Sequence, residues 1–151
     1  MSDQLFQRFL LSEEEKLPPD PVQKARFFFE DMLSDMSCYL TQHDFNVETK
    51  IQWPNANVSL MFDYVNRILD NVSSNIIKYA DAQKTVTISL LHQEGWLVLQ
   101  FSNEIVNKEK GMDSTGVGVQ NICTMMEEMG CKCLVNQNNQ NYVLELWFQT
   151  V

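Results

Sequence analysis

Apolar residues recur at helical spacing in three parts of the chain and alternate with polar residues in five others. The helical spacing predicts three helices: from Pro21 to about Gln42, from about Ser59 to Ala80, and from Val119 to a stop at Gly130. The alternation predicts five strands: Val47–Trp53, Thr85–Leu91, Trp96–Ser102, Cys131–Gln137 and Tyr142–Phe148. Asp20 followed by Pro21 is typical of a helix start, so Asp20 is expected to cap the first helix.

The order of these elements predicts the fold class. Helix, strand, helix, two strands, helix and two strands make an α/β two-layer sandwich, with helices packed on one face of a mixed β-sheet. Residues 21–151 are expected to form this single domain. In residues 1–20 an apolar piece precedes Leu17, Pro18 and Pro19, which predicts an N-terminal linker or the remnant of a preceding helical domain.

Composition and charge narrow the classes of function. The chain has 151 residues, of which 44% are hydrophobic and 11% aromatic, and this suits one globular domain. The formal net charge of −9 argues against a nucleic-acid partner, because phosphate backbones are bound by clustered Lys and Arg. No apolar run approaches the ~20 residues of a membrane span and no signal peptide opens the chain. We therefore expect a cytoplasmic chain, although its parent protein can still be a membrane sensor.

One stripe of the second expected helix is polar. Asn71, Asn75 and Lys78 are separated by four and then three residues, so two amides and one ammonium group share a narrow line along the helix. Asparagine is a mediocre helix former, because its side chain competes for backbone hydrogen bonds. The stripe has two interpretations: a solvated outer face, or a row of groups that bind a ligand.

A glycine pair precedes the third expected helix, in the sequence Gly116-Val117-Gly118. A glycine-rich turn that opens a helix offers free backbone N–H groups and the positive end of the helix dipole, and both suit phosphate oxygens. Glycines also serve ordinary loops, so the pair alone is a weak signal. Together with the polar stripe, however, it favours a nucleotide site.

The segment DNVSSNIIKYAD, residues 70–81, closely resembles the asparagine box of sensor histidine kinases. That box belongs to their ATP-binding catalytic domain, which has the Bergerat fold of the GHKL superfamily shared with gyrase-type ATPases. The resemblance implies ATP and Mg²⁺ as cofactors. It implies that Asn75 binds Mg²⁺ and that Lys78 reaches the phosphates, while Asn71 and Tyr79 line the same pocket.

The family's two glycine boxes are matched unequally. The second box, whose glycines let a lid fold over the phosphates, is matched at Ser114, Thr115, Gly116, Val117 and Gly118, with Ser114 in place of its leading glycine. The first box, Asp-x-Gly-x-Gly after a strand, is replaced by Asn103, Glu104 and Ile105. Asn103 would then accept the hydrogen bond from the adenine amino group in place of aspartate. A short mobile lid is expected at residues 103–115.

Neither histidine of the chain suits the family's phosphoacceptor. His43 ends the first expected helix and His92 lies at a strand end. Neither stands on a dimerisation helix followed by the acidic residue and downstream proline that the family's acceptor sequence shows. The resemblance therefore implies that the phosphoacceptor lies on a separate dimerisation domain, and the catalytic residue within this chain stays unknown.

The four cysteines lack the two-pair spacing of a zinc site. They are expected to be reduced core or surface thiols.

The resemblance implies the catalytic domain of a two-component sensor histidine kinase. It would transfer the γ-phosphoryl group of Mg-ATP to a histidine of the dimerisation domain, and a response regulator receiver domain would act downstream. The loss of the first glycine box leaves open a degenerate, non-catalytic kinase-like interaction module. An anti-sigma-type protein serine kinase, which shares the fold, also stays open.

Overall fold

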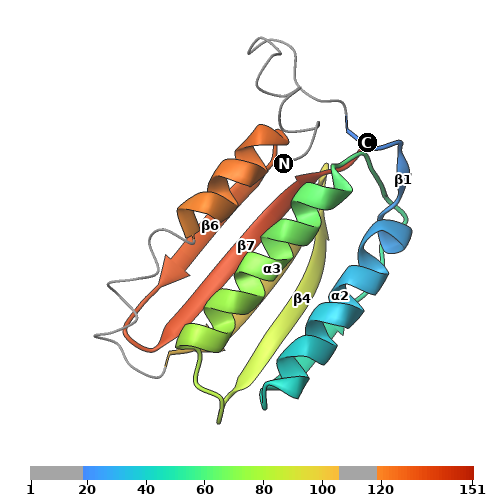
Figure 1. The fold of residues 1–151 in the computed structure, drawn as a ribbon. Helices are drawn as coiled ribbons and strands as arrows, with labels where there is room; N and C mark the ends of the chain where they lie inside the picture. The colour runs from blue at the N-terminus through green and yellow to red at the C-terminus, as the bar shows by residue number, and fades with distance from the viewer. Residues whose placement is uncertain (1–18, 106–118) are drawn as a thin grey trace, which may run out of the picture.

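The protein is a two-layer sandwich, in which helices cover one face of a five-stranded sheet (Figure 1). The computed structural model describes residues 19–105 and 119–151. The strands lie in the order β2-β4-β5-β7-β6. Their bounds are Asn46–Ile51 for β2, Thr85–Gln93 for β4, Trp96–Glu104 for β5, Lys132–Gln137 for β6 and Asn141–Gln149 for β7.

The sheet is mixed, as the sequence predicts. β2 runs parallel to β4, with Val47 opposite Val86, and the other neighbouring strands are antiparallel. Helices α2 (Ala25–Gln42) and α3 (Phe62–Tyr79) lie side by side in front of the sheet, and the helix at 119–128 lies in front of its β6 edge (Figure 1). The predicted fold class is therefore confirmed.

The first two helices begin later than the sequence predicts. α2 begins at Ala25 instead of Pro21, because Gln23–Lys24 forms a short strand, β1, which pairs with β3 at Asn57–Val58. α3 begins at Phe62 instead of Ser59, since Ser59 and Leu60 form hydrogen bonds with the backbone of Asp20. The pairing of two short strands that are far apart in the chain has no signature in the neighbouring sequence. Helical spacing therefore could not predict where these two helices begin.

Asp20 has a different partner from the one that the sequence predicts. The first residue before α2 is Lys24, which makes no side-chain capping bond. The Asp20 carboxylate instead accepts a hydrogen bond from the backbone N–H of Phe62, at 2.9 Å, and its backbone carbonyl accepts one from the Ser59 hydroxyl, at 3.0 Å. Asp20 thus satisfies a free N–H at the start of α3, the helix that carries the asparagine stripe.

Replacing Asp20 with alanine is expected to lower the free energy of unfolding by about 1 kcal/mol, the usual cost of losing a helix N-terminal carboxylate. Urea denaturation measures this directly. Asp35→Ala, at an exposed position of α2, is the matched control and should change stability little. Equal effects of the two substitutions would contradict the role given to Asp20.

The core lies between the helices and the covered face of the sheet. Phe29 of α2 meets Phe148 of β7 with ring centroids 5.0 Å apart, and neither side chain has any exposed surface. Ile68 of α3 and Ile122 of the helix at 119–128 are also fully buried. All three helices are therefore anchored on one continuous apolar layer, and α3 is held over the middle of the sheet.

Candidate nucleotide-binding site

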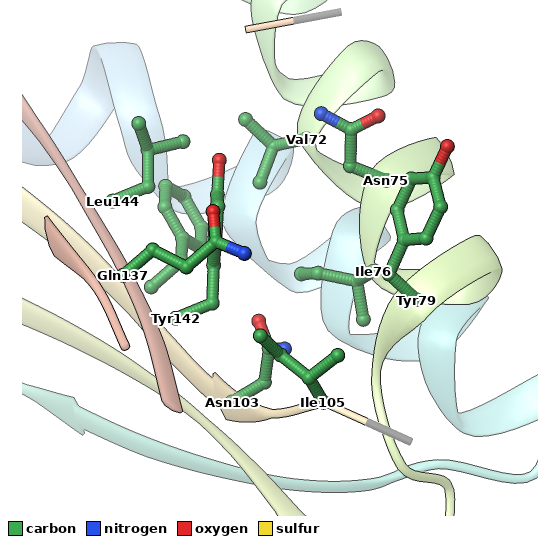
Figure 2. A pocket seen from close by; sticks show the side chains of 10 residues that line it. Val72, Asn75, Ile76, Tyr79, Asn103, Ile105, Gln137, Tyr142 and Leu144 are labelled. Carbon is green, nitrogen blue, oxygen red and sulfur yellow. The ribbon is translucent and has the colours of Figure 1, made fainter. Parts of the chain in front are cut away.

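A cavity opens between α3 and the ends of three strands, β5, β6 and β7 (Figure 2). The empty space between its walls, counted together with the open solvent at its mouth, is about 460 Å³. Its walls are mostly apolar, with a few polar groups at separate points. The lining residues are Val72, Asn75, Ile76, Tyr79, Phe101, Asn103, Ile105, Gln137, Tyr142 and Leu144.

Backbone hydrogen bonds fasten the elements around this cavity to one another. The N–H of Asp81, just past α3, donates to the carbonyl of Glu104 at the end of β5, at 2.8 Å. The N–H of Ile105 donates to the carbonyl of Gln140 in the β6–β7 turn, also at 2.8 Å. Ala80 and Ile105 form an isolated antiparallel bridge. The ends of α3, β5 and the β6–β7 hairpin therefore form one connected frame.

α3 provides one wall of the cavity through Asn75 and Tyr79, which are both half-buried (Figure 2). No residue in the described parts of the chain forms a hydrogen bond with the Asn75 side chain, so its amide is available to a ligand. Asn71 is half-buried one turn earlier and Lys78 is exposed, and neither lines the cavity. Of the asparagine stripe, Asn75 is thus the member that lines the cavity.

Asn103 forms part of the opposite wall, near the end of β5. It is 7% exposed, and its Nδ2 donates to the carbonyl of Glu104 at 3.3 Å. That bond fixes the amide so that Oδ1 stays free to accept a hydrogen bond. The predicted lid is wrong for residues 103–105, since Asn103 and Glu104 belong to β5 and Ile105 pairs with Ala80. β5 continues to Glu104, past Ser102, where the alternation of apolar and polar residues ends.

Tyr142, on β7, brings a buried hydroxyl to the same cavity. Among the described residues this hydroxyl has no hydrogen-bond partner. Burial first, and then the neighbouring Cys133 and Cys123, together raise the pKa of Tyr142 to about 12. A buried, unpaired donor is costly, and a ligand in this cavity that supplied an acceptor would satisfy it.

Replacing Tyr142 with phenylalanine is expected to raise the free energy of unfolding of the nucleotide-free chain by about 1 kcal/mol, because it removes the unpaired hydroxyl and keeps the ring. Urea denaturation at neutral pH tests this. A large loss of stability would show instead that the hydroxyl is bonded.

The pH dependence of stability provides a second check on Tyr142. A folded-state pKa above the unfolded value of 10.0 contributes stability that is present in full below pH 10.0 and is lost as pH rises through about 12. Tyr142→Phe should therefore lose stability less steeply than the wild type over that interval.

The remaining site residues expected from the sequence are Ser114, Thr115, Gly116, Val117 and Gly118. They lie outside the described residues, as do residues 106–113 of the expected lid.

Sequence reasoning missed the wall formed by β6 and β7. Tyr142 precedes Leu144, Leu146 and Phe148 in the inward-facing series of β7, and this alternation was the signal that could have placed its polar tip in the interior. Gln137 gave no comparable signal, because it lies at the end of an edge strand whose other residues are largely exposed.

The side chains around the cavity suit a purine nucleotide bound together with a hard cation. Apolar walls from Val72, Ile76 and Leu144 suit a flat base, and Asn103 Oδ1 suits an amino group on its edge. The Asn75 amide oxygen at the mouth is a hard ligand of the kind that Mg²⁺ accepts beside phosphate and water. In the described residues no group of three or more His, Cys, Asp or Glu side chains could hold a metal ion, so a cation here would take few protein ligands.

Comparison with known families decides the family of the chain. Residues 57–149, which are more than half of the sequence, match the model of the GHKL domain. The chain belongs to the GHKL family. The matched range starts in β3 and ends with β7, so it contains every residue that lines the cavity of this GHKL domain.

A curated relative of this GHKL domain is sensor histidine kinase YrkQ of Bacillus subtilis. The two are 29% identical over 148 residues, which are 98% of this chain but 34% of YrkQ. The chain thus spans about a third of the length of the curated relative that it matches. None of the helices in the described parts of the chain is long and apolar enough to cross a membrane.

Solved structures of histidine kinases share the fold of this GHKL domain. Histidine kinase AdeS of Acinetobacter baumannii superposes with a TM-score of 0.68 at 14% identity, over 97% of this chain and 75% of AdeS. The catalytic domain of histidine kinase ThkA superposes with a TM-score of 0.65 at 13% identity, over 85% of this chain and 95% of that domain. At these identities the likeness concerns the arrangement of the sheet and its covering helices.

Proposed function

We propose that this GHKL domain is the ATP-binding catalytic domain of a two-component sensor histidine kinase. It binds Mg-ATP and transfers the γ-phosphoryl group to a histidine on a separate dimerisation domain. One observation carries the proposal: a single cavity has the Asn75 amide at one wall and the Asn103 amide at the other. These are the two positions to which the sequence resemblance assigns the metal and the adenine.

Different residues of the cavity bind different parts of the nucleotide. Asn103 Oδ1 accepts a hydrogen bond from the adenine amino group, and Ile76 and Leu144 pack against the base. Asn75 holds Mg²⁺, which neutralises phosphate charge during transfer. Lys78, exposed one turn beyond Asn75, extends toward the phosphates. Tyr79 and Asn71 border the ribose and phosphate side of the mouth, and the residues at 114–118 bind the phosphates.

The transfer needs a second protein domain. Both His43 and His92 are exposed, and neither lines the cavity. We therefore assign the phosphoacceptor histidine to a helical dimerisation domain of the same kinase and the next transfer to a response regulator receiver domain. The catalytic domain comprises residues 21–151. Asp20, the residue before it, accepts a hydrogen bond from the backbone N–H of Phe62 at the start of α3. Its place in such a kinase is cytoplasmic.

A degenerate, non-catalytic kinase-like module is the second candidate. It is favoured by Asn103 in place of the family's aspartate, because an uncharged acceptor bonds less strongly to the adenine amino group. A protein serine kinase of the anti-sigma type differs from our proposal in its substrate alone. Incubation with ATP and either the dimerisation domain or a serine-containing protein partner separates the two kinases.

The first test is a calorimetric titration of this chain with a non-hydrolysable ATP analogue, with and without Mg²⁺. We expect saturable binding in the micromolar to sub-millimolar range that weakens at least about tenfold when Mg²⁺ is removed, since the phosphates then lose a bridging cation. ADP with Mg²⁺ is the comparison for the γ-phosphate. A folded sample that binds neither nucleotide would favour the degenerate module.

A further inference from the structure

Cys123 and Cys133 place two thiols almost in bonding contact. The Sγ atoms lie 2.6 Å apart, only about 0.5 Å beyond the ~2.05 Å of a disulfide bond. Both cysteines are half-buried and both are free thiols. The two sulfurs therefore need to approach by only about half an ångström to form the bond.

The two cysteines lie on two different elements, a helix and a strand of the sheet. Cys123 lies on the helix at 119–128, next to the fully buried Ile122, and Cys133 lies on β6. Among the strands in residues 19–105 and 119–151, β6 lies at the edge and pairs with β7 alone. A bond between the two sulfurs would fasten this helix to the edge of the sheet.

Solvent reaches the two sulfurs differently. Cys123 lines an open groove together with Gln120, Thr124 and Glu127, whereas Cys133 does not line it. Burial raises the pKa of the Cys133 thiol, and the hydrogen bond with Cys123 and the carboxylate of Glu127 raise it further. Cys133 is therefore a protonated thiol at neutral pH, and Cys123 is the sulfur that a dissolved reagent meets first.

We propose that Cys123 and Cys133 are a dithiol modification site, which a low-molecular-weight disulfide oxidises reversibly to an intramolecular disulfide. The Cys123 sulfur, having lost its proton, attacks one sulfur of the reagent, and a mixed disulfide forms as the first thiolate leaves. The Cys133 sulfur then loses its proton to solvent and attacks Sγ of Cys123, releasing the second thiolate. The two released thiolates take up the two protons, so one reagent disulfide becomes two thiols.

Peptide mapping of the oxidised chain tests this proposal directly. The folded wild type is incubated with oxidised glutathione, its free thiols are alkylated, and the digest is analysed by mass spectrometry. We expect one cross-linked product that joins the peptides of Cys123 and Cys133, with Cys38 and Cys131 alkylated. Excess reduced glutathione should restore four alkylated cysteines. The same treatment of Cys38→Ser, an exposed and distant control, should give the same cross-link.

Thermal unfolding gives an independent readout. The oxidised wild type should melt about 5 °C above the reduced form, because the bond constrains the unfolded segment 123–133. Cys133→Ser should show no such difference between oxidised and reduced samples. Separate alkylation of Cys123 and Cys133 after oxidation, or a cross-link to Cys131 or Cys38, would overturn the proposal. Neither readout involves a nucleotide, so the result stands apart from that of the ATP titration.

Discussion

Replacing Asn75 with alanine is expected to abolish the Mg²⁺-dependent part of ATP binding, a loss of at least about tenfold in affinity, while the fold stays intact. Asn75 is the member of the asparagine stripe that lines the cavity. Mg²⁺ in such a site takes few protein ligands, so the loss of its amide oxygen leaves the cation without an anchor on the helix. Calorimetry with an ATP analogue at saturating Mg²⁺ measures the loss.

The control for Asn75 is another asparagine of the same helix. Asn66 is exposed on α3 and does not line the cavity, so Asn66→Ala changes helix propensity in a similar way without touching the site. Both variants should keep the wild-type circular dichroism spectrum. The metal assignment would be lost if Asn75→Ala still bound ATP more tightly with Mg²⁺ than without it, by the wild-type factor.

The fold was largely predictable because its main signals are local. Apolar residues repeat at helical spacing along α3, and buried and more exposed residues tend to alternate along β5 and β7. The sequence of each element therefore indicates which of its faces is buried. The start of α2 was not predictable, since the pairing of β1 with β3 depends on residues more than thirty positions apart. Asp20 was assigned to the nearer helix for the same reason, although its partner is Phe62.

The candidate site was predictable at α3 and at the end of β5, and not at the β6–β7 hairpin. Asn75, Tyr79 and Asn103 stand in segments whose residue order resembles the kinase family, and all three line the cavity. Tyr142 and Gln137 reach it only because β7 pairs with β5 and β6 with β7. No motif in the sequence links the β6–β7 hairpin to the asparagine helix. Long-range strand pairing therefore sets the part of the site that sequence reasoning misses.

Replacing Asn103 with leucine is expected to weaken ATP binding by about 10- to 100-fold and to remove the preference for adenine. The leucine side chain has a similar volume but no acceptor, so the adenine amino group loses its partner inside a mostly apolar cavity. The wild type should prefer ATP to inosine triphosphate, which has a carbonyl oxygen where ATP has the amino group. Calorimetry of both nucleotides with both proteins gives a complete thermodynamic cycle, in which the change of nucleotide takes the place of a second mutation.

The preference of Asn103 for an amino group depends on its own neighbour. If the amide turned over to donate to the carbonyl of inosine, its oxygen would face the carbonyl of Glu104, to which Nδ2 now donates at 3.3 Å. Repulsion between the two oxygens opposes that turn and keeps Oδ1 directed at the base. Asn46→Leu, at an exposed position of β2, is the matched control and should leave the preference unchanged. Equal affinity of the wild type for ATP and inosine triphosphate would show that Asn103 does not read the adenine, and the degenerate module would then become the better account of this domain.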